Sequence, residues 1–273
     1  MMSQETKELT LGQKQRYNRH LILDGFGKEG QLRLLNAKVL VVGAGGLGSP
    51  VLMYLAAAGV GTLGIVDGDV VSISNLQRQI IHGTPDLDTP KVDSAEKRIH
   101  EIDPEVKVEK YNTYLNEDNV LDTIRDYDFV LECSDNFSTK YLVNDACIRL
   151  GKAFCIGGIT RYSGQVMVHA PGTACYRCLF PEPPAEEDVE LGSKVGVLGC
   201  IAGMLGTVQA TEAVKYLARV GEGLTNALLT FDALSMQWMR LDFCKNDSCA
   251  LCGKNPTITE LKEYAFKPCS KRK

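Results

Sequence analysis

Short apolar runs alternate with longer amphipathic stretches over the first 150 residues of the chain. The apolar runs are rich in Val, Ile and Leu and end at glycine or polar residues, as buried strands do. We expect strands at residues 38–42, 63–67, 106–111 and 129–133. We expect helices at residues 50–58, 91–102, 119–125 and 140–150, and one or two more within 10–36. This alternation predicts an α/β fold with a doubly wound, Rossmann-like and largely parallel sheet.

The pattern changes after Lys152, where apolar runs follow one another in pairs. We expect further strands at residues 153–159, 164–170, 227–233 and 236–243. These strands are expected to extend the sheet in mixed or antiparallel fashion.

The most apolar long stretch covers residues 196–217 and contains Gln209, Glu212 and Lys215. Because charged groups are costly at the centre of a bilayer, a buried core helix is favoured over a membrane span. Residues 181–196 are polar and rich in proline, which predicts a mobile loop. The polar residues 267–273 predict a disordered tail.

Composition and charge narrow the classes of function. A net charge of −4 and a pI near 5.7 argue against a general binder of nucleic acid or of a lipid surface. The first ten residues have no apolar segment, so we expect no secretory signal. Ten cysteines without such a signal indicate a reducing, cytoplasmic compartment. Their spacing is therefore examined for metal binding before disulfides.

A glycine-rich turn follows the first strand in the sequence VLVVGAGGLGS, residues 39–49. Gly43, Gly45 and Gly48 fit the pattern G-x-G-x-x-G, in which the backbone and a helix N-terminus approach phosphates. Asp67 lies 19 residues after Gly48, where an acidic side chain would bind ribose hydroxyls. The turn fits NAD, FAD or ATP, and on this evidence alone NAD leads. A tight turn without a ligand is the alternative.

Three features count against NAD. The first is an extra glycine, Gly46, which opens the turn further. The second is a set of polar side chains after the second strand, namely Asn75, Arg78 and Gln79 in SNLQRQ, followed by Lys91. Taken singly, each cation fits a solvated surface position. Hydride transfer does not need two cations near phosphates, whereas adenylyl transfer needs them to neutralise the α-phosphate and the leaving pyrophosphate.

The third feature is the sequence CSDN, in which Asp135 and Asn136 follow a strand end. The carboxyl ends of strands line the ligand crevice of a doubly wound sheet, so Asp67 and Asp135 should both face the site. A second carboxylate in such a site can carry Mg²⁺ for phosphate chemistry. The sequence therefore favours transfer of an adenylyl group from ATP.

Two C-x-x-C pairs, Cys175 with Cys178 and Cys249 with Cys252, lie about 70 residues apart. Four thiolates complete a tetrahedral Zn²⁺ site with no open position for water, so we interpret the site as structural. The long spacing indicates a clamp that holds the end of the chain on the domain. A redox pair or unligated core cysteines are the alternatives, and Cys244 is a less favoured ligand.

The other cysteines have mostly apolar neighbours in sequence. We expect Cys133, Cys147 and Cys155 to be buried thiols. Cys200 begins a helix after the polar loop, where the thiol pKa can fall. Packing is the favoured interpretation of Cys200, and a nucleophile is the alternative. Cys269 is the fifth of these remaining cysteines.

With these residues assembled, the chain resembles the MoeB/ThiF/HesA family of ubiquitin-activating-type adenylyltransferases from about Gln15 to Gly253. The motifs RYNRHLIL, GAGGLGS, SNLQRQ, TPK and CSDN and both cysteine pairs occur in the order of that family. The resemblance implies a homodimer that uses MgATP to adenylate the C-terminal glycine of a ubiquitin-like sulfur carrier of the ThiS or MoaD type, which ends in Gly-Gly. The acyl-adenylate then becomes a thiocarboxylate for thiamine or molybdopterin-type cofactor synthesis. We expect no fused rhodanese domain, and therefore a separate sulfurtransferase as the source of sulfur.

The resemblance also assigns roles to residues of this chain. It implies that Gly46 contacts the nucleotide and that Asp67 binds the ribose. It implies that Asn75, Arg78 and Lys91 bind the phosphates and that Asp135 binds Mg²⁺. It assigns Arg19 to the partner's site in a dimer, a role that the spacing argument does not predict. The expected catalytic residues are Arg19, Arg78, Lys91 and Asp135. The expected nucleotide-binding residues are Gly43, Gly45, Gly46, Asp67, Asp69, Ser74, Asn75, Leu76, Gln77, Arg78, Lys91, Asp135 and Asn136.

The chain departs from the family at one position that bears on mechanism. Many relatives carry a cysteine four residues before the glycine that corresponds to Gly196, and this chain has Gly192 there. Adenylation without a covalent carrier intermediate is therefore the expected activity. An NAD-dependent oxidoreductase and a non-catalytic carrier-binding module are the alternatives.

The resemblance divides the chain into four parts. Residues 1–36 form a helical segment, and residues 37–155 the Rossmann-like ATP-binding part. Residues 156–256 hold the carrier-binding strands, the crossover loop and the zinc site within the same domain, and residues 257–273 form a tail.

Overall fold

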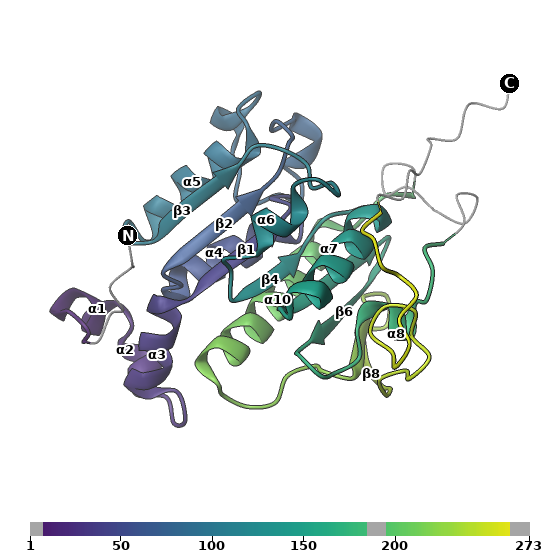
Figure 1. Ribbon diagram of the computed structural model, residues 1–273. Coiled ribbons are helices and arrows are strands. Elements are labelled where there is room, and N and C mark those ends of the chain that lie inside the picture. The colour runs from purple at the N-terminus through teal and green to yellow at the C-terminus, as the bar shows by residue number, and fades with distance from the viewer. Residues whose placement is uncertain (1–7, 185–194, 263–273) are drawn as a thin grey trace, which may run out of the picture.

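A single sheet runs through the computed structural model, which describes residues 8–184 and 195–262 (Figure 1). Its eight strands lie in the order β3-β2-β1-β4-β5-β6-β7-β8. They are β1 (Lys38–Val42), β2 (Thr62–Val66), β3 (Lys107–Tyr111), β4 (Phe129–Glu132), β5 (Ala153–Thr160), β6 (Ser163–His169), β7 (Ala227–Asp232) and β8 (Gln237–Asp242). The predicted α/β fold, with a parallel sheet extended by antiparallel strands, is confirmed.

The first five strands of the chain are parallel, and their order reverses at β1. β2 and β3 lie on one side of β1, and β4 and β5 lie on the other. In doubly wound sheets the ligand crevice opens at such a reversal, beyond the carboxyl ends of the strands. Here those ends are the glycine turn after β1 and the segment that begins at Cys133 after β4.

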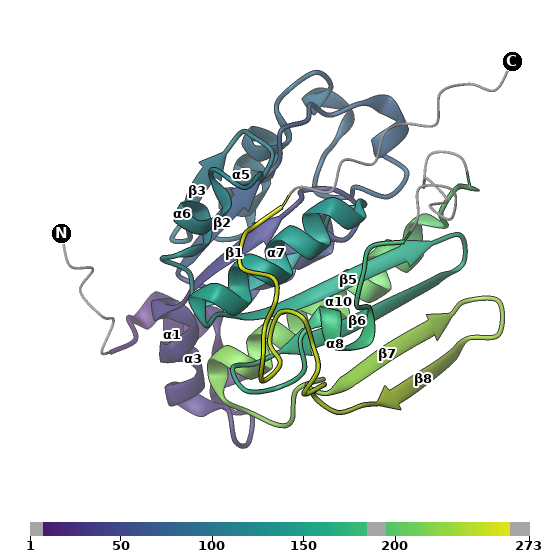
Figure 2. The same cartoon turned by 45° about the vertical axis from the view of Figure 1, so that its right-hand side comes forward.

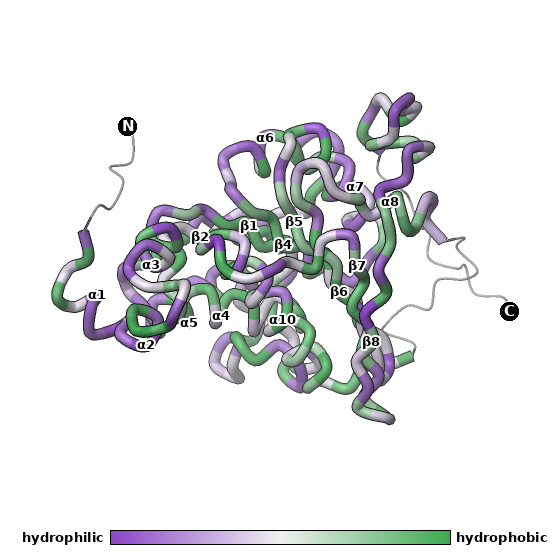
Figure 3. The backbone as a smooth tube through the Cα atoms, turned by 90° about the horizontal axis from the view of Figure 1, so that it is seen from below, coloured by the Kyte–Doolittle hydropathy of each residue, from purple (hydrophilic) through white to green (hydrophobic). Residues whose placement is uncertain are grey.

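Helices cover both faces of the parallel strands. One face is packed by α3 (Gly27–Asn36), α4 (Gly48–Ala58), α5 (Lys91–Ile102) and α10 (Gly199–Ala218). The other face is packed by α6 (Val120–Ile124), α7 (Phe137–Leu150) and α8 (Tyr176–Leu179). Apart from Lys38 at the start of β1 and Glu132 at the end of β4, these two central strands are correspondingly hydrophobic (Figure 3). Strands covered on both faces read as continuous apolar runs, which is why the pattern predicts them well.

The antiparallel strands β6, β7 and β8 form a wing beyond the parallel strands (Figure 2). All six residues of β8 are exposed, including Trp238, Met239 and Leu241. The wing therefore presents apolar side chains to solvent at the end of the sheet that lies farthest from β3.

The apolar stretch within residues 196–217 forms the buried helix α10, as predicted. Its polar residues are satisfied internally, because Gln209 donates to the carbonyl of Glu132 (3.0 Å) and Glu212 pairs with Lys215 (2.5 Å). A search of the described residues for a helix long and apolar enough to cross a membrane finds none.

The N-terminal segment differs from the prediction of one or two helices. It contains α1 (Leu11–Arg16), α2 (Asn18–Leu21) and α3, and Tyr17 separates the first two. Tyr17 is pulled into the core, where its hydroxyl donates to Asp103 (2.6 Å) and its ring packs against Gly59. This long-range contact interrupts the helix and is invisible to local periodicity.

Other predictions lie partly or wholly outside the described residues. The predicted mobile loop at 181–196 has its centre in 185–194, and the predicted tail and Cys269 lie in 263–273. The division of the chain into four parts stays a prediction. Its boundary at residue 155 falls inside β5, so the two central parts share a strand.

Candidate active site

The backbone of the glycine turn packs so closely that it leaves no room for side chains. Gly43 has a φ of 96°, and its N–H donates to the carbonyl of Val66 (2.8 Å). A Cβ at Gly48 would stand 1.9 Å from the Gly43 carbonyl oxygen, so this position admits only glycine. The turn leads directly into α4, whose N-terminal N–H groups and dipole favour an anion.

A cavity of about 720 Å³ opens at this turn, large enough for a nucleotide and more. It gathers most of the residues that the sequence assigns to the site. They are Gly43, Gly45, Gly46, Asp67, Asp69, Arg78, Lys91, Asp135 and Asn136. Residues separated by more than 90 positions thus line one space, at the reversal of the sheet order.

Five predicted site residues do not line this cavity. Ser74 and Asn75 belong to the 3-10 helix Ile73–Asn75, where the Asn75 side chain accepts the N–H of Ser72 (3.1 Å). Leu76 and Gln77 continue that segment toward Arg78, which does reach the cavity. Arg19 is exposed on α2 and does not line the cavity of its own chain. Their roles stay predictions.

Asp67 is buried at the end of β2, and its carboxylate fixes the turns around it. One oxygen accepts the N–H of Ala44 (2.8 Å) and the other accepts the N–H of Asp69 (2.9 Å). Burial raises the pKa of Asp67, and the charge of Lys91, 3.9 Å away, opposes this rise. The position confirms that Asp67 faces the cavity next to the glycine turn.

Lys91 begins α5 and is 5% exposed, with its ammonium group inside the site. Its Nζ donates to Asp69 (2.7 Å), and Tyr114 donates its hydroxyl to the same carboxylate. Burial tends to raise the pKa of Asp69, but the hydrogen bonds from Lys91 and Tyr114 outweigh burial and lower it. A phosphate must therefore compete with Asp69 for Lys91, which the sequence does not reveal.

Asp135 is exposed in the wall of the cavity. The backbone just before it is held in place by buried polar contacts. Lys140 of α7 donates to the carbonyl of Ser134 (2.9 Å), to that of Gly157 (2.6 Å) and to Glu132 (2.5 Å). Burial raises the pKa of the fully buried Glu132, and Lys140 counteracts this rise. The buried ion pair thus fixes the backbone immediately before Asp135.

Sequence reasoning does not assign Glu132 and Lys140 to the site. The available signal is a charged residue that ends the otherwise apolar strand FVLE, followed eight residues later by a cation. A charge in a buried strand must be paired, because burying an isolated charge costs several kcal/mol. This cost is comparable to the whole free energy of unfolding of a domain.

His82 fastens the glycine turn to α5. It is 7% exposed, and its Nε2 lies 2.9 Å from the Ala44 carbonyl oxygen. A carbonyl oxygen only accepts, so Nε2 carries the proton and Nδ1 accepts from the Ser94 hydroxyl (2.8 Å). Burial lowers the pKa of His82 below its ordinary value of 6.5, which keeps the ring neutral.

This neutral histidine predicts a loss of stability in mild acid. Above pH 6.5 His82 is neutral in both the folded and the unfolded chain and adds no pH dependence. Below pH 6.5 His82 binds a proton in the unfolded chain but stays neutral in the folded chain until a lower pH. The free energy of unfolding therefore falls as pH falls. Urea unfolding between pH 7.5 and 5.5 should show a smaller slope for His82→Gln than for the unchanged chain. Equal slopes, at equal metal content, would show that His82 already titrates normally.

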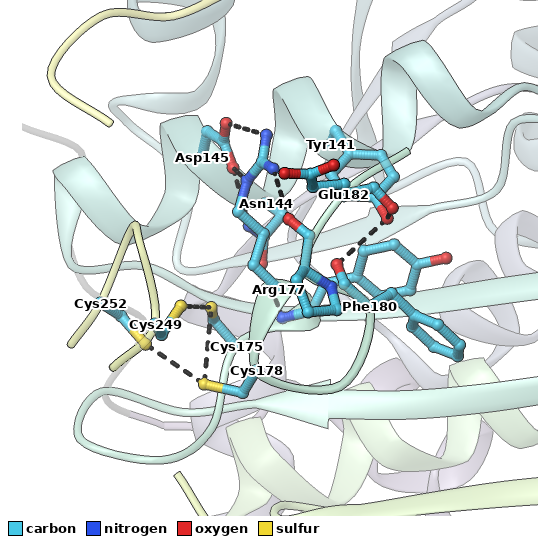
Figure 4. A network of polar contacts seen from close by, with 12 residues as sticks. Tyr141, Asn144, Asp145, Cys175, Arg177, Cys178, Phe180, Glu182, Cys249 and Cys252 are labelled. Atoms are coloured by element: carbon cyan, nitrogen blue, oxygen red, sulfur yellow. Dashed lines mark hydrogen bonds and ion pairs between the residues drawn. The ribbon is translucent and has the colours of Figure 1, made fainter. Parts of the chain in front are cut away.

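The four paired cysteines form one cluster (Figure 4). Their sulfur atoms all lie within 4.8 Å of one another, with separations of 3.9 Å (Cys175–Cys178), 3.7 Å (Cys175–Cys249) and 3.4 Å (Cys178–Cys252). Tetrahedral Zn–S bonds of about 2.3 Å place sulfurs about 3.8 Å apart, so the cluster fits this ion. Cys244 is exposed and does not belong to the cluster.

Buried polar contacts tie the first cysteine pair to α7 (Figure 4). Arg177, between the two cysteines, donates from Nε and Nη2 to both carboxylate oxygens of Asp145 (2.8 Å each). Its guanidinium also lies over the ring of Tyr141, 4.6 Å from the centroid. Since Tyr141 and Asp145 belong to α7, the cysteine cluster and the helix that follows Asp135 form one packed unit.

The remaining cysteines agree with the predictions in three of four described cases. Cys133, Cys147 and Cys155 are buried, and burial raises the pKa of each thiol. Cys200 lies in the first turn of α10 as expected, but it is exposed. The interpretation of Cys200 as a packed thiol is therefore wrong for the single chain.

Comparison with known proteins agrees with this geometry. Residues 17–251 match the ThiF family. A sulfur carrier protein adenylyltransferase from Thermus thermophilus is 46% identical over 255 residues, which cover 91% of this chain and 94% of that protein. An adenylyltransferase and sulfurtransferase MOCS3 from Sus scrofa is also 46% identical, over 91% of this chain, but the match spans only 55% of its length.

Solved structures share the fold at lower identity. Escherichia coli MccB, in a crystal structure with MccA-N7isoASN, superposes with a TM-score of 0.79 and 22% identity. The match covers 92% of this chain and 77% of MccB. At this identity the likeness shows a common fold alone.

Proposed function

The chain belongs to the ThiF family and is an adenylyltransferase, and we propose that it adenylates the C-terminal glycine of a ubiquitin-like sulfur carrier, releasing pyrophosphate. The observation that carries this proposal is one cavity that joins the glycine turn, Asp67, Arg78, Lys91 and Asp135. The Thermus thermophilus relative, matched over 94% of its length, supports a sulfur carrier as the substrate.

The proposed reaction is an in-line displacement at the α-phosphorus of ATP. A carboxylate oxygen of the carrier forms the new P–O bond, and the bond to the pyrophosphate oxygen breaks. All three of Asp67, Arg78 and Lys91 line the cavity. We assign neutralisation of the leaving group's charge to Arg78 and Lys91, and binding of the ribose to Asp67. The chain's contribution is therefore mainly positioning and charge stabilisation.

Asp135 fits the role of a ligand for the Mg²⁺ that accompanies ATP. Its carboxylate is exposed at the cavity wall and, in the described part of the chain, forms no hydrogen bond or ion pair. Mg²⁺ prefers oxygen ligands of this kind and, when bound, supplies charge neutralisation to the phosphates. Asn136 is less available as a metal ligand, because it is the N-cap of α7 and its side chain accepts the N–H of Thr139 (2.7 Å).

The cysteine cluster is proposed to hold Zn²⁺ in a structural role. Four thiolates fill the tetrahedral positions, and none of the four cysteines lines the cavity. Cys249 and Cys252 follow β8, so the ion would fasten the end of the sheet extension to the turn that holds Cys175 and Cys178.

Two features support a protein as the second substrate. The cavity continues along β5 to β8, past Gly157, Gly158 and Met239. Next to this part of the cavity, the exposed apolar residues Met239 and Leu241, which share one face of β8, can pack against a folded carrier. Sulfur would come from a separate sulfurtransferase, for thiamine or molybdopterin-type cofactor synthesis.

A homodimer is proposed in which Arg19 completes the partner's site. Arg19 is exposed on α2 and outside the cavity of its own chain, which leaves it available to a second copy. Mixing inactive Arg19→Ala and Asp135→Ala chains should therefore restore activity, because each mixed dimer regains one intact site. Random exchange gives about a quarter of the unmixed activity. No recovery after verified subunit exchange would contradict a role in the partner's site, because it would show that Arg19 acts within its own chain.

The proposed function is tested with a panel of carrier proteins that end in Gly-Gly. Incubation with MgATP should add one adenylyl group to one carrier, detected by intact mass spectrometry, with release of pyrophosphate. A carrier without its last glycine is the control. Binding of NAD in place of ATP would support the oxidoreductase, and carrier binding without pyrophosphate release would support a non-catalytic module.

A further inference from the structure

The paired register of β4 and β5 ends where the two strands reach the cavity. Its last pair is Glu132 with Ile156. Past this pair, Asp135 follows β4, and β5 continues through Gly157 and Gly158, and all three of these residues line the cavity. Ladder hydrogen bonds hold neighbouring strands at a fixed separation, so past this pair another contact must set the distance between the two walls.

The ammonium group of Lys140 bridges the two walls. Its Nζ donates to the carbonyl of Ser134 (2.9 Å) after β4 and to the carbonyl of Gly157 (2.6 Å) in β5. Its third hydrogen bond goes to the fully buried Glu132 (2.5 Å), whose carboxylate balances the charge. An ammonium group has three donors, so Lys140 has none left for a ligand although it lines the cavity.

The two carbonyl contacts act on the residues that follow them. A peptide group is planar, so a hydrogen bond to the carbonyl of Ser134 also orients the N–H side of that group, which belongs to Asp135. The contact with Gly157 orients Gly158 in the same way. Asp135 is the proposed Mg²⁺ ligand, and Gly158 lies in the part of the cavity proposed to receive the carrier. One buried cation therefore holds the backbone on the side of each substrate.

We propose that Lys140 is a positioning residue that sets the distance between the nucleotide and the carrier tail, an assignment that rests on the proposed function. In-line attack needs the carboxylate oxygen close to the α-phosphorus, and a misplacement of about 1 Å can cost about a hundredfold in rate. Glu132 fixes the ammonium at the end of β4, because its other carboxylate oxygen accepts the N–H of Ser134 (2.9 Å). The pair thus acts on the chemical step, and not on the affinity for either substrate alone.

The test removes both charges together. Lys140→Met alone would leave Glu132 buried without its counter-charge and would destabilise the fold, whereas removing both charges of a buried pair is often neutral for stability. In the double variant Glu132→Gln with Lys140→Met, both side chains keep their approximate size. Single-turnover pyrophosphate release by the zinc-loaded protein, at saturating MgATP and carrier, should slow about a hundredfold.

Binding measurements separate positioning from a structural role. The dissociation constants of the double variant for MgATP and for the carrier, each measured by titration calorimetry, should change less than about threefold, because the pair acts on the transition state. A structural role would change the melting temperature but not the rate per folded molecule. Lys140→Arg, which keeps the charge and the donors, should recover most of the lost rate.

Glu212→Gln with Lys215→Met is the matched control. Glu212 is 5% exposed and accepts a hydrogen bond from Lys215 (2.5 Å), and neither residue lines the cavity. This variant loses a lysine–glutamate pair of the same kind on α10. It should release pyrophosphate at the unchanged rate, whatever its melting temperature.

Three results for the double variant would overturn the assignment and leave the proposed function intact. An unchanged rate would show that the pair does not position the substrates. A loss of affinity for MgATP or for the carrier as large as the loss of rate would show that the pair supports a single binding wall. Absence of a melting transition would show that the pair holds the fold. Failure of the unchanged chain to release pyrophosphate with any carrier would overturn the proposed function, and this assignment with it.

Discussion

Replacing Asp135 by alanine should reduce the rate of pyrophosphate release by about a thousandfold and leave the fold intact. Opposite charges about 4 Å apart interact by roughly 4 kcal/mol at an effective dielectric constant of 20, and each 1.36 kcal/mol is about tenfold in rate. The fold should survive because Asp135 is exposed and the described structure shows no hydrogen bond to its carboxylate. Single-turnover kinetics with a carrier and MgATP measure the effect.

Asp126→Ala is the control for this substitution. Asp126 is also exposed, but it lies at the end of α6 and outside the cavity. Its rate should equal that of the unchanged chain. Turnover of Asp135→Ala at the unchanged rate would remove this carboxylate from the mechanism, and a collapse of its melting transition would mean that Asp135 acts on the fold.

Replacing Cys178 by serine should abolish the bound metal and lower the melting temperature by about 10 °C. A structural zinc site contributes several kcal/mol to folding, and in a chain of this size 1 kcal/mol shifts the melting temperature by roughly 2–4 °C. The loss should spread to the small core that Cys175, Cys249 and Leu251 form around the site. Metal analysis and calorimetry of freshly purified, reduced protein measure both effects.

Cys244→Ser provides the comparison, since Cys244 is exposed and lies outside the cluster although it is five residues from Cys249. It should keep one zinc per chain and the unchanged melting temperature. If the unchanged chain carries no zinc, the cluster is not a metal site. Loss of zinc in Cys244→Ser would mean that the ligand set differs from the four paired cysteines.

The fold can be predicted from the sequence wherever burial alone decides the pattern. β1 and α5 have the predicted bounds, residues 38–42 and 91–102, because the first is apolar after Lys38 and the second has one apolar face. The N-terminal helices are the exception. Their division depends on Tyr17 reaching Asp103, 86 positions away, and local periodicity carries no information about such a contact.

The same division holds for the site. Glycine spacing and the ends of β1, β2 and β4 predict that Gly45, Asp67 and Asp135 share one space, because parallel strands end on one side of a sheet. The partners of Lys91 and the buried pair beneath Asp135 escape prediction. Pairing between charges depends on side-chain geometry after folding, and Asp69 is one of several acidic residues that could meet Lys91.

Cys200 illustrates a different limit. Its apolar neighbours in sequence predict packing, but Ile201 and Ala202 lie on the buried face of α10 while Cys200 lies on the exposed one. A helix that is apolar on most of its circumference does not reveal its outward face by composition. The four paired cysteines are easier to predict, because their C-x-x-C spacing brings two sulfurs together within each pair.

The most direct test of the adenylyltransferase assignment is exchange of labelled pyrophosphate into ATP, catalysed by the zinc-loaded protein with Mg²⁺ and a carrier that ends in Gly-Gly. Exchange requires that the acyl-adenylate forms reversibly, so it reports the proposed step without any later sulfur transfer. We expect exchange with one carrier of the panel, and none when that carrier lacks its terminal glycine. Absence of exchange with every carrier, from protein that binds ATP, would contradict adenylation of a sulfur carrier.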